Sequence, residues 1–224
     1  MSSDCSGNNL KKISKNHILI FDFDGTIADT FHKLLEIGNR LSEEFDFKRI
    51  EDEDVEELKH KSARETITHL NIPLLKIPQI IAKAKKELNK EIGLIKPIHG
   101  LKEILIQIKG LGLKMGILTS NSLKNVLSFL ENNGLNLFDF VQTTPKIWSK
   151  NRSLKSLIDK QHLKIADVIY IGDETRDIVA AQKAGIRTIA VTWGYNSSRA
   201  LENHRPDYLI HSPQELYHLF SVTL

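Results

Sequence analysis

The sequence predicts an α/β fold, a Rossmann-like parallel sheet core with a small helical cap domain inserted after the first strand. Short apolar runs alternate with segments of helical periodicity along most of the chain, as in a parallel sheet with helices on both faces. Residues 31–95, in contrast, contain helical patterns and no clear strand. We therefore expect residues 16–30 and 96–224 to form the core and residues 31–95 to form the cap.

The first strand is expected at Ile18–Phe21, a continuous apolar run that is followed at once by Asp22 and Asp24 and broken at Gly25. Two ionised carboxylates inside a strand buried on both faces would cost several kcal/mol of desolvation. The strand should therefore end at these residues. In an open α/β sheet, the carboxyl ends of the strands are where ligands bind.

The segment that follows reads as helical. Apolar residues at helical spacing predict a helix over residues 26–40, and an acidic run at 51–57 followed by basic residues suits the dipole of a solvated helix. Pro78 suits the first turn of a helix over residues 79–91. Two to four helices are expected between residues 31 and 95.

The remaining core elements alternate. Strands are expected at residues 113–118, 138–142, 167–171, 187–191 and 208–210, and helices at 101–110, 122–132, 150–160, 175–185 and 213–220. Glycines and polar residues separate these segments, as expected for the turns that connect strands and helices.

Composition excludes several classes of function. The 224 residues are 41% hydrophobic and 26% charged, and 31 basic against 28 acidic residues leave a net charge of +3. Because no dense basic stripe with aromatics appears, we expect no nucleic-acid partner. No apolar run approaches the about 20 residues that a membrane span needs. Residues 1–15, which hold the lone Cys5, are expected to be a mobile leader of a cytoplasmic protein.

Polar side chains recur at the ends of the expected strands. They are Asp22, Asp24, Thr119, Ser120, Asp173, Asp177 and Thr192. Taken alone, each is more often a helix cap than a functional group. Together they would meet at one edge of a parallel sheet, where three aspartates repel one another. A divalent cation would relieve that repulsion, and magnesium selects carboxylate oxygens.

Four ordered motifs now stand out: Asp22-Phe23-Asp24-Gly25-Thr26, Ile117-Leu118-Thr119-Ser120-Asn121, Lys150, and Ile171-Gly172-Asp173 with Asp177. Their order and spacing resemble the haloacid dehalogenase (HAD) superfamily, and within it the phosphoglycolate-phosphatase-like phosphatases. The resemblance spans residues 16–220. The family lysine is often followed by proline, whereas Lys150 precedes Asn151, so Lys146, which follows Pro145, is a rival.

The resemblance implies a role for each acidic residue. Asp22 would be the nucleophile that forms an aspartyl-phosphate, and Asp24 would shuttle the proton of the leaving group and of water. The Asp22 and Asp173 side chains and the Asp24 main-chain carbonyl would bind Mg²⁺, with Asp177 and Gly25 in supporting positions.

The resemblance also implies a phosphate site. Thr119, Ser120 and Lys150 would hold the phosphoryl oxygens, and the helix that begins near Ser122 would reinforce that anion site. Dehalogenases of the superfamily lack an acid at the position of Asp24, so Asp24 favours phosphoryl chemistry. The expected activity is Mg²⁺-dependent hydrolysis of a small phosphorylated metabolite resembling phosphoglycolate. Alternatives are a sugar phosphomutase and a non-catalytic phosphate-binding or partner-binding module.

Specificity is expected to reside in the cap, which in this family closes over the site. Lys59, Lys61 and Arg64 are candidate contacts to the substrate, although a solvated helix face explains them as well. The turn at residues 193–195 is expected either to line the leaving-group pocket or to pack against a neighbouring helix. A monomer or a homodimer is expected.

Overall fold

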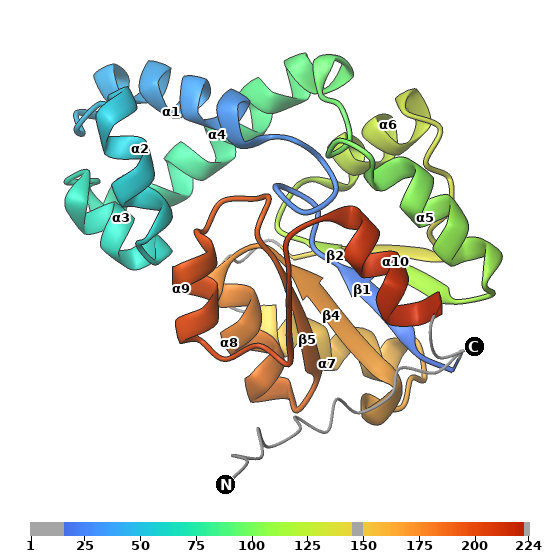
Figure 1. The fold of residues 1–224 in the computed structure, drawn as a ribbon. Helices are drawn as coiled ribbons and strands as arrows, with labels where there is room; N and C mark the ends of the chain where they lie inside the picture. The colour runs from blue at the N-terminus through green and yellow to red at the C-terminus, as the bar shows by residue number, and fades with distance from the viewer. Residues whose placement is uncertain (1–15, 145–149, 222–224) are drawn as a thin grey trace, which may run out of the picture.

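The computed structural model describes residues 16–144 and 150–221. Its centre is a six-stranded sheet in the order β3-β2-β1-β4-β5-β6, with every neighbouring pair parallel (Figure 1). The strands are β1 (Ile18–Phe21), β2 (Lys114–Thr119), β3 (Phe140–Thr143), β4 (Val168–Gly172), β5 (Arg187–Val191) and β6 (Tyr208–Ile210). The predicted α/β class is confirmed.

Strand β1 lies in the middle of the sheet and sets the register of its neighbours. Phe21 is aligned with Ile117 of β2 and with Ile171 of β4. The residues that directly follow these three positions therefore leave the sheet side by side. This alignment brings segments about 100 and 150 residues apart in the sequence to one edge.

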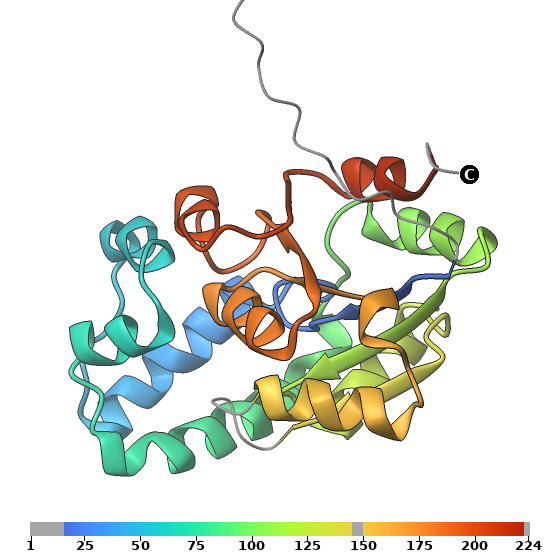
Figure 2. The ribbon, with the colours of Figure 1, turned by 90° about the horizontal axis from the view of Figure 1, so that it is seen from below.

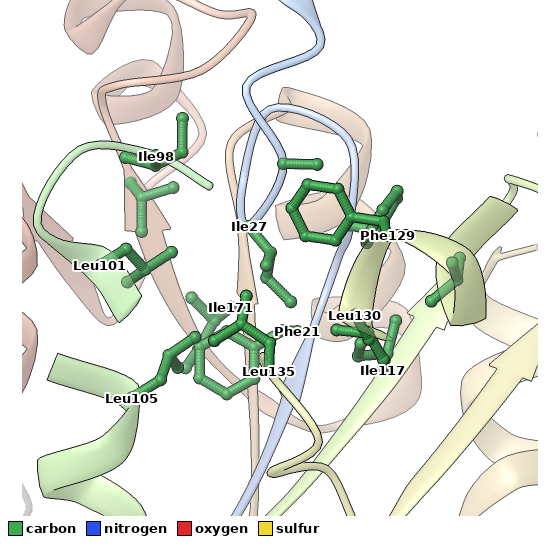
Figure 3. Close-up of a cluster of buried hydrophobic side chains, with 14 of the residues drawn as sticks. Phe21, Ile27, Ile98, Leu101, Leu105, Ile117, Phe129, Leu130, Leu135 and Ile171 are labelled. Atoms are coloured by element: carbon green, nitrogen blue, oxygen red, sulfur yellow. The ribbon is translucent and has the colours of Figure 1, made fainter. Parts of the chain in front are cut away.

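Helices cover both faces of the sheet. One layer contains α5 (Leu101–Gly110), α6 (Leu123–Asn132) and α10 (Pro213–Ser221); the other contains α7 (Lys150–Lys160) and α8 (Thr175–Ala184), and α9 (Ser198–Asn203) packs beside α8. Figure 3 shows part of the larger apolar cluster, in which Phe21, Ile117 and Ile171 lie between the sheet and helices α5 and α6. Burial of these side chains provides the main stabilisation of the core.

The insertion after β1 is helical, as predicted. It contains α1 (Phe31–Phe45), α2 (Asp52–Lys59), α3 (Ala63–His69) and α4 (Ile77–Glu91), with short 3₁₀ turns at Leu74–Lys76 and Ile92–Leu94. Figures 1 and 2 show these helices, which we call the cap, at the end of the sheet toward which β1 leads. Ser62 begins α3 with a capping box in which Glu65 returns the hydrogen bond, and Pro78 occupies the first turn of α4.

The helix predicted over residues 26–40 is wrong at both ends. It begins at Phe31 and continues to Phe45. Before it, Gly25 takes a positive φ of 75°, and the amides of Ile27 and Ala28 both donate to the carbonyl of Phe23. Ile27 and Ala28 are fully buried, so this segment is a core turn. The apolar residues that resemble a first helical turn are thus used for packing instead.

Among the described residues, no helix combines the length and hydropathy that a membrane crossing requires.

Candidate active site

Two strand ends and the first turns of two helices supply a cluster of four charged side chains. Asp22 follows β1 and continues its pairing with β4, because its amide donates to the carbonyl of Ile171 at 2.8 Å. Asp173 follows β4, and Asp177 lies in the first turn of α8. Lys150, the first residue of α7, reaches the same point from the layer that also contains α8. The four side chains are buried together at the carboxyl edge of the sheet.

Lys150 is the cation of this cluster. Its Nζ lies 2.6 Å from Asp22 Oδ2 and also forms an ion pair with Asp177 Oδ1. Burial alone would lower the pKa of Lys150, but the carboxylates of Asp177 and Asp22 outweigh it, and the pKa is raised well above its usual value. Lys150 is therefore charged in the folded protein. The rival Lys146 lies outside the described residues.

The carboxylates outnumber the cations. Asp22, Asp173 and Asp177 each place an oxygen within 4.8 Å of the others. Burial and the neighbouring acids raise the pKa of Asp173 well above its usual value, and burial raises the pKa of Asp177 to about 6 although Lys150 opposes it. Lys150 cannot neutralise three buried carboxylates, and the nearby cation Arg176 is paired with Glu174. A hard divalent cation would neutralise them, and a set of carboxylate oxygens suits Mg²⁺. The sequence predicts a supporting position for Asp177, and its carboxylate lies in the same group as those of Asp22 and Asp173.

Two donors hold the Asp173 carboxylate. Thr26 Oγ1 donates to Oδ1 at 2.5 Å, and the Tyr195 amide donates to Oδ2 at 2.8 Å. Two glycines make room for it, because a Cβ at Gly25 or at Gly194 would collide with this carboxylate. Thr26 belongs to the motif after β1, but its role as a donor to Asp173 was not predicted. That role depends on a contact between residues 147 positions apart.

Asp24 occupies a different environment from Asp22. Its two carboxylate oxygens each accept a hydrogen bond from Asn121 Nδ2 at 3.0 Å. Asn121 is in turn held by Asn125, whose side chain donates to Asn121 Oδ1 at 2.9 Å. Burial, together with the negative charge of Asp22, raises the pKa of Asp24 to about 7. A carboxyl with this pKa can donate and accept a proton near neutral pH.

The predicted phosphate residues lie beside these acids. Thr119 is buried at the end of β2, and its hydroxyl accepts a hydrogen bond from the main-chain N–H of Asn121 at 3.0 Å. Ser120 lines the cavity described below. Ser122 caps α6, the helix whose N-terminus was expected near the phosphate. Thr192 differs: its hydroxyl lies 3.2 Å from His211 Nδ1, and no described contact joins it to the carboxylates.

A cavity of about 420 Å³ connects the core to the cap. Asp24, Ser120, Asn121, Arg176 and Tyr195 are among the core residues that line it. Neither Arg176 nor the cap residue Lys85, which also lines the cavity, was predicted as a site residue. Arg176 is adjacent to the predicted Asp177, whereas Lys85 lies in α4, and no motif includes Lys85.

The three cap cations predicted as substrate contacts are not equivalent. Lys59 and Lys61 line the cavity but form ion pairs with Glu56 at 2.9 Å and Glu57 at 2.8 Å. The structure places Arg64 in a separate hollow between α3 and α9. The solvated-face explanation therefore accounts for Arg64.

The turn at residues 193–195 fulfils both of its predicted alternatives. Tyr195 lines the cavity, with its hydroxyl 3.0 Å from Thr30 Oγ1. Trp193 packs against the large apolar cluster and donates to the Thr26 carbonyl at 3.1 Å. The next residue, Asn196, holds the cap against the core, because its Nδ2 donates to the carbonyls of Lys59 and Lys61, each at 3.0 Å.

A family model for haloacid dehalogenase-like hydrolases matches residues 19–191, a span that contains Asp22, Asp24, Thr119, Lys150, Asp173 and Asp177. The chain belongs to the haloacid dehalogenase-like hydrolase family. The predicted resemblance is confirmed, and so is the expectation of a hydrolytic enzyme of this family.

Relatives within the family are similar over nearly their whole length. The phosphoglycolate phosphatase of Synechococcus elongatus is 33% identical over 199 residues, which cover 88% of this chain and 94% of the relative. The pyrophosphatase PpaX of Bacillus mycoides is 24% identical over 213 residues, 92% of this chain and 98% of the relative. A crystal structure described as a predicted phosphatase from Clostridium acetobutylicum shares the fold, with a TM-score of 0.77 at 22% identity over 90% of this chain and 96% of that chain.

Proposed function

We propose that this family member is a Mg²⁺-dependent phosphatase that hydrolyses a small phosphorylated metabolite through an aspartyl-phosphate on Asp22. The observation that carries the proposal is that Asp22 and Asp24, two positions apart, have carboxyl groups in different environments. Asp22 is fixed by Lys150 at 2.6 Å, whereas Asp24 has a pKa raised to about 7 by burial and by the charge of Asp22. An oriented carboxylate beside a second carboxyl with a raised pKa suits a nucleophile and an acid–base residue.

The Asp22 carboxylate is oriented at both oxygens. The Phe23 amide donates to Oδ1 at 2.8 Å, and Lys150 donates to Oδ2. These contacts reduce the freedom of the carboxylate before it attacks phosphorus, which lowers the entropic part of the barrier. The bond formed joins Asp22 to phosphorus, and the bond broken joins phosphorus to the leaving-group oxygen.

Asp24 would deliver its proton to that leaving oxygen and recover it from the water that hydrolyses the aspartyl-phosphate. The side-chain nitrogen Nδ2 of Asn121 lies 3.0 Å from both Asp24 oxygens, so it can hold the carboxyl in place through both steps. Thr119, Ser120 and Lys150 would contact the phosphoryl oxygens, where negative charge is concentrated during transfer.

The acidic cluster fits a magnesium ion. The carboxylates of Asp22, Asp173 and Asp177, with the main-chain carbonyl of Asp24, would hold it. When bound, the ion supplies positive charge that lets an anionic nucleophile approach an anionic phosphate. The buried excess of carboxylates over cations is the structural reason for expecting it.

Phosphoglycolate is the first substrate to test, because the Synechococcus elongatus relative is a phosphoglycolate phosphatase. A phosphomutase would use the same two aspartates, and a binding module would use the phosphate site alone. The complete set of motif residues favours an enzyme over a binding module. The lone Cys5 in a polar segment is the reason for proposing a cytoplasmic location.

The activity is tested by phosphate release from p-nitrophenyl phosphate and phosphoglycolate, with Mg²⁺ and with EDTA. We expect Mg²⁺-dependent turnover that Asp22→Asn abolishes. Turnover by Asp22→Asn equal to that of the wild type would refute the nucleophile. Isomerisation of a sugar phosphate with little free phosphate would identify a mutase, and phosphate binding without turnover would identify a binding module.

A further inference from the structure

The cavity above Asp24 is divided by polarity. Its core side is polar, with Asp24, Ser120, Asn121, Glu174 and Arg176. Its cap side is mostly aliphatic and receives residues from all four cap helices. The part of the cavity next to Asp24 is therefore polar, and the part farther from Asp24, inside the cap, is an apolar chamber.

The cap lysines lie at the boundary between these halves. The carbonyls of Lys59 and Lys61 bind Asn196 of the core at 3.0 Å, and the carbonyl of Lys85 accepts from Asn125 of α6 at 3.4 Å. Each lysine therefore belongs to a part of the cap that touches the core. Farther into the cap the lining is formed by Leu34, Leu35, Val55, Ile67, Ile77 and Ile80.

Leu34 and Ile80 pack partly against the large apolar cluster, but the six aliphatic side chains leave the cavity between them open. Helices α2 and α3 contain no buried residue, and the six side chains named above are only half-buried. A four-helix insertion that needed only its own stability would bury such residues against one another. Here they face a cavity of about 420 Å³, a volume within the range of about 300–1,000 Å³ found for small-molecule sites.

On the basis of the proposed phosphatase activity, we propose that the substrate is an amphiphilic phosphomonoester whose leaving group carries an aliphatic chain into the cap. The phosphate group would lie at Asp22 and Asp24, and the hydrocarbon would lie among the half-buried aliphatic residues. A two-carbon acid such as glycolate would reach only the boundary lined by the cap lysines and would leave most of the aliphatic chamber empty. The chamber thus selects a larger and less polar leaving group than glycolate.

The test is a series of methyl, butyl, hexyl and octyl monophosphates, compared with phosphoglycolate in the presence of Mg²⁺. Burial of each methylene should raise kcat/KM about fourfold until the chamber is filled. A kcat/KM that does not change with chain length, or that is highest for phosphoglycolate, would overturn the assignment while leaving the phosphatase activity intact.

Two variants of α4 separate the chamber from the catalytic residues. Ala84 lines the cavity, and Ala82 is exposed on the same helix. Ala84→Phe should reduce the preference for hexyl over methyl phosphate by tenfold or more. Ala82→Phe should leave this preference and the turnover of methyl phosphate unchanged. Equal effects of the two variants would contradict the proposal.

A binding measurement tests the apolar site independently of turnover. In the Asp22→Asn protein, hexyl phosphate should give saturable shifts in the isoleucine methyl spectrum, and methyl phosphate should not. The residues expected to respond are Ile50, Ile67, Ile72, Ile77, Ile80 and Ile81. If no ester is hydrolysed but these shifts occur, the phosphatase proposal fails and the apolar site stands. If millimolar hexyl phosphate gives no shifts, the apolar site is refuted.

Discussion

At the scale of single residues, the two aspartates after β1 differ through their neighbours. Asp22 contacts Lys150, whereas Asp24 contacts the neutral amide of Asn121. Lys150 orients the Asp22 carboxylate for attack. Burial and the negative charge of Asp22 raise the pKa of Asp24 to about 7, although the hydrogen bond from Asn121 acts in the opposite direction. The same side-chain type, two positions apart, is thereby suited to two steps of one reaction.

The pH dependence of the first chemical step should follow Asp24. Its pKa is about 7, so the protonated acid that the leaving group needs is lost as pH rises above this value. The kcat/KM for an alkyl phosphate should fall about tenfold per pH unit on the alkaline side. Asp24→Asn should remove this limb and lower kcat by about 10²–10⁴-fold. A wild-type profile that is flat up to pH about 9 would contradict the assignment of the acid.

The hydrogen bond from Thr26 to Asp173 should tune the metal site. Thr26→Val removes the donor at 2.5 Å from Oδ1 but keeps the shape of the side chain. The Mg²⁺ concentration needed for half-maximal activity should rise about 10–100-fold, as is usual when a residue that orients a ligand is lost. The matched control is Thr68→Val, because the Thr68 hydroxyl donates to the Arg64 carbonyl within α3 and not to a carboxylate. Equal Mg²⁺ dependence in the two variants would show that Thr26 does not position Asp173.

At the scale of elements, the strand ends and the loops that follow them build the site. Alternation of apolar runs and helices predicted the sheet, and the acids and Thr119 were predicted at its carboxyl edge. The turn over residues 24–30 was missed because buried Ile27 and Ala28 repeat the apolar spacing of a helix. Asn121, Asn196 and Arg176 were missed for another reason. Their roles depend on partners in distant segments, and the spacing of residues in the sequence does not reveal such contacts.

The loop after β5 should tolerate no side chain at Gly194. A Cβ there would collide with the carboxylate of Asp173. Gly194→Ala should destabilise the protein by about 1–3 kcal/mol and abolish most activity, because the carboxylate must move. Gly38→Ala, in the middle of α1 with no atom within 4 Å of the added Cβ, should instead stabilise the protein by about 0.5–1 kcal/mol. Urea denaturation of both variants tests this, and a neutral Gly194→Ala would show that the loop can shift.

At the scale of the whole molecule, the fold holds an excess of buried negative charge at one edge of its sheet. The pKa values of Asp24 and Asp177 are raised from 3.8 to about 7 and about 6, so the folded state binds protons more tightly than the unfolded chain. At pH values between the ordinary pKa of 3.8 and these raised pKa values, the folded state therefore carries more protons than the unfolded chain. The free energy of unfolding of the metal-free protein should therefore fall as pH rises from about 4 to about 7.

Magnesium should reverse this trend. It binds only the folded site and competes there with protons, so its stabilisation should be larger at pH about 8 than at pH about 5.5. Thermal unfolding in EDTA and in Mg²⁺ at the two pH values measures the difference. A metal-free protein that is more stable at the higher pH, or an equal Mg²⁺ effect at both, would argue against a metal bound by these carboxylates.

The central claim is that phosphoryl transfer passes through Asp22. The most direct measurement is acid quenching of the Asp24→Asn protein during turnover of p-nitrophenyl phosphate with Mg²⁺, followed by mass spectrometry of its peptides. Because this variant lacks the base that activates water, the aspartyl-phosphate should accumulate. We predict one phosphoryl group on Asp22, absent in EDTA and absent when Asp22 is also changed to asparagine. Phosphoryl label on another residue, or none in a protein that still releases p-nitrophenol, would contradict the account.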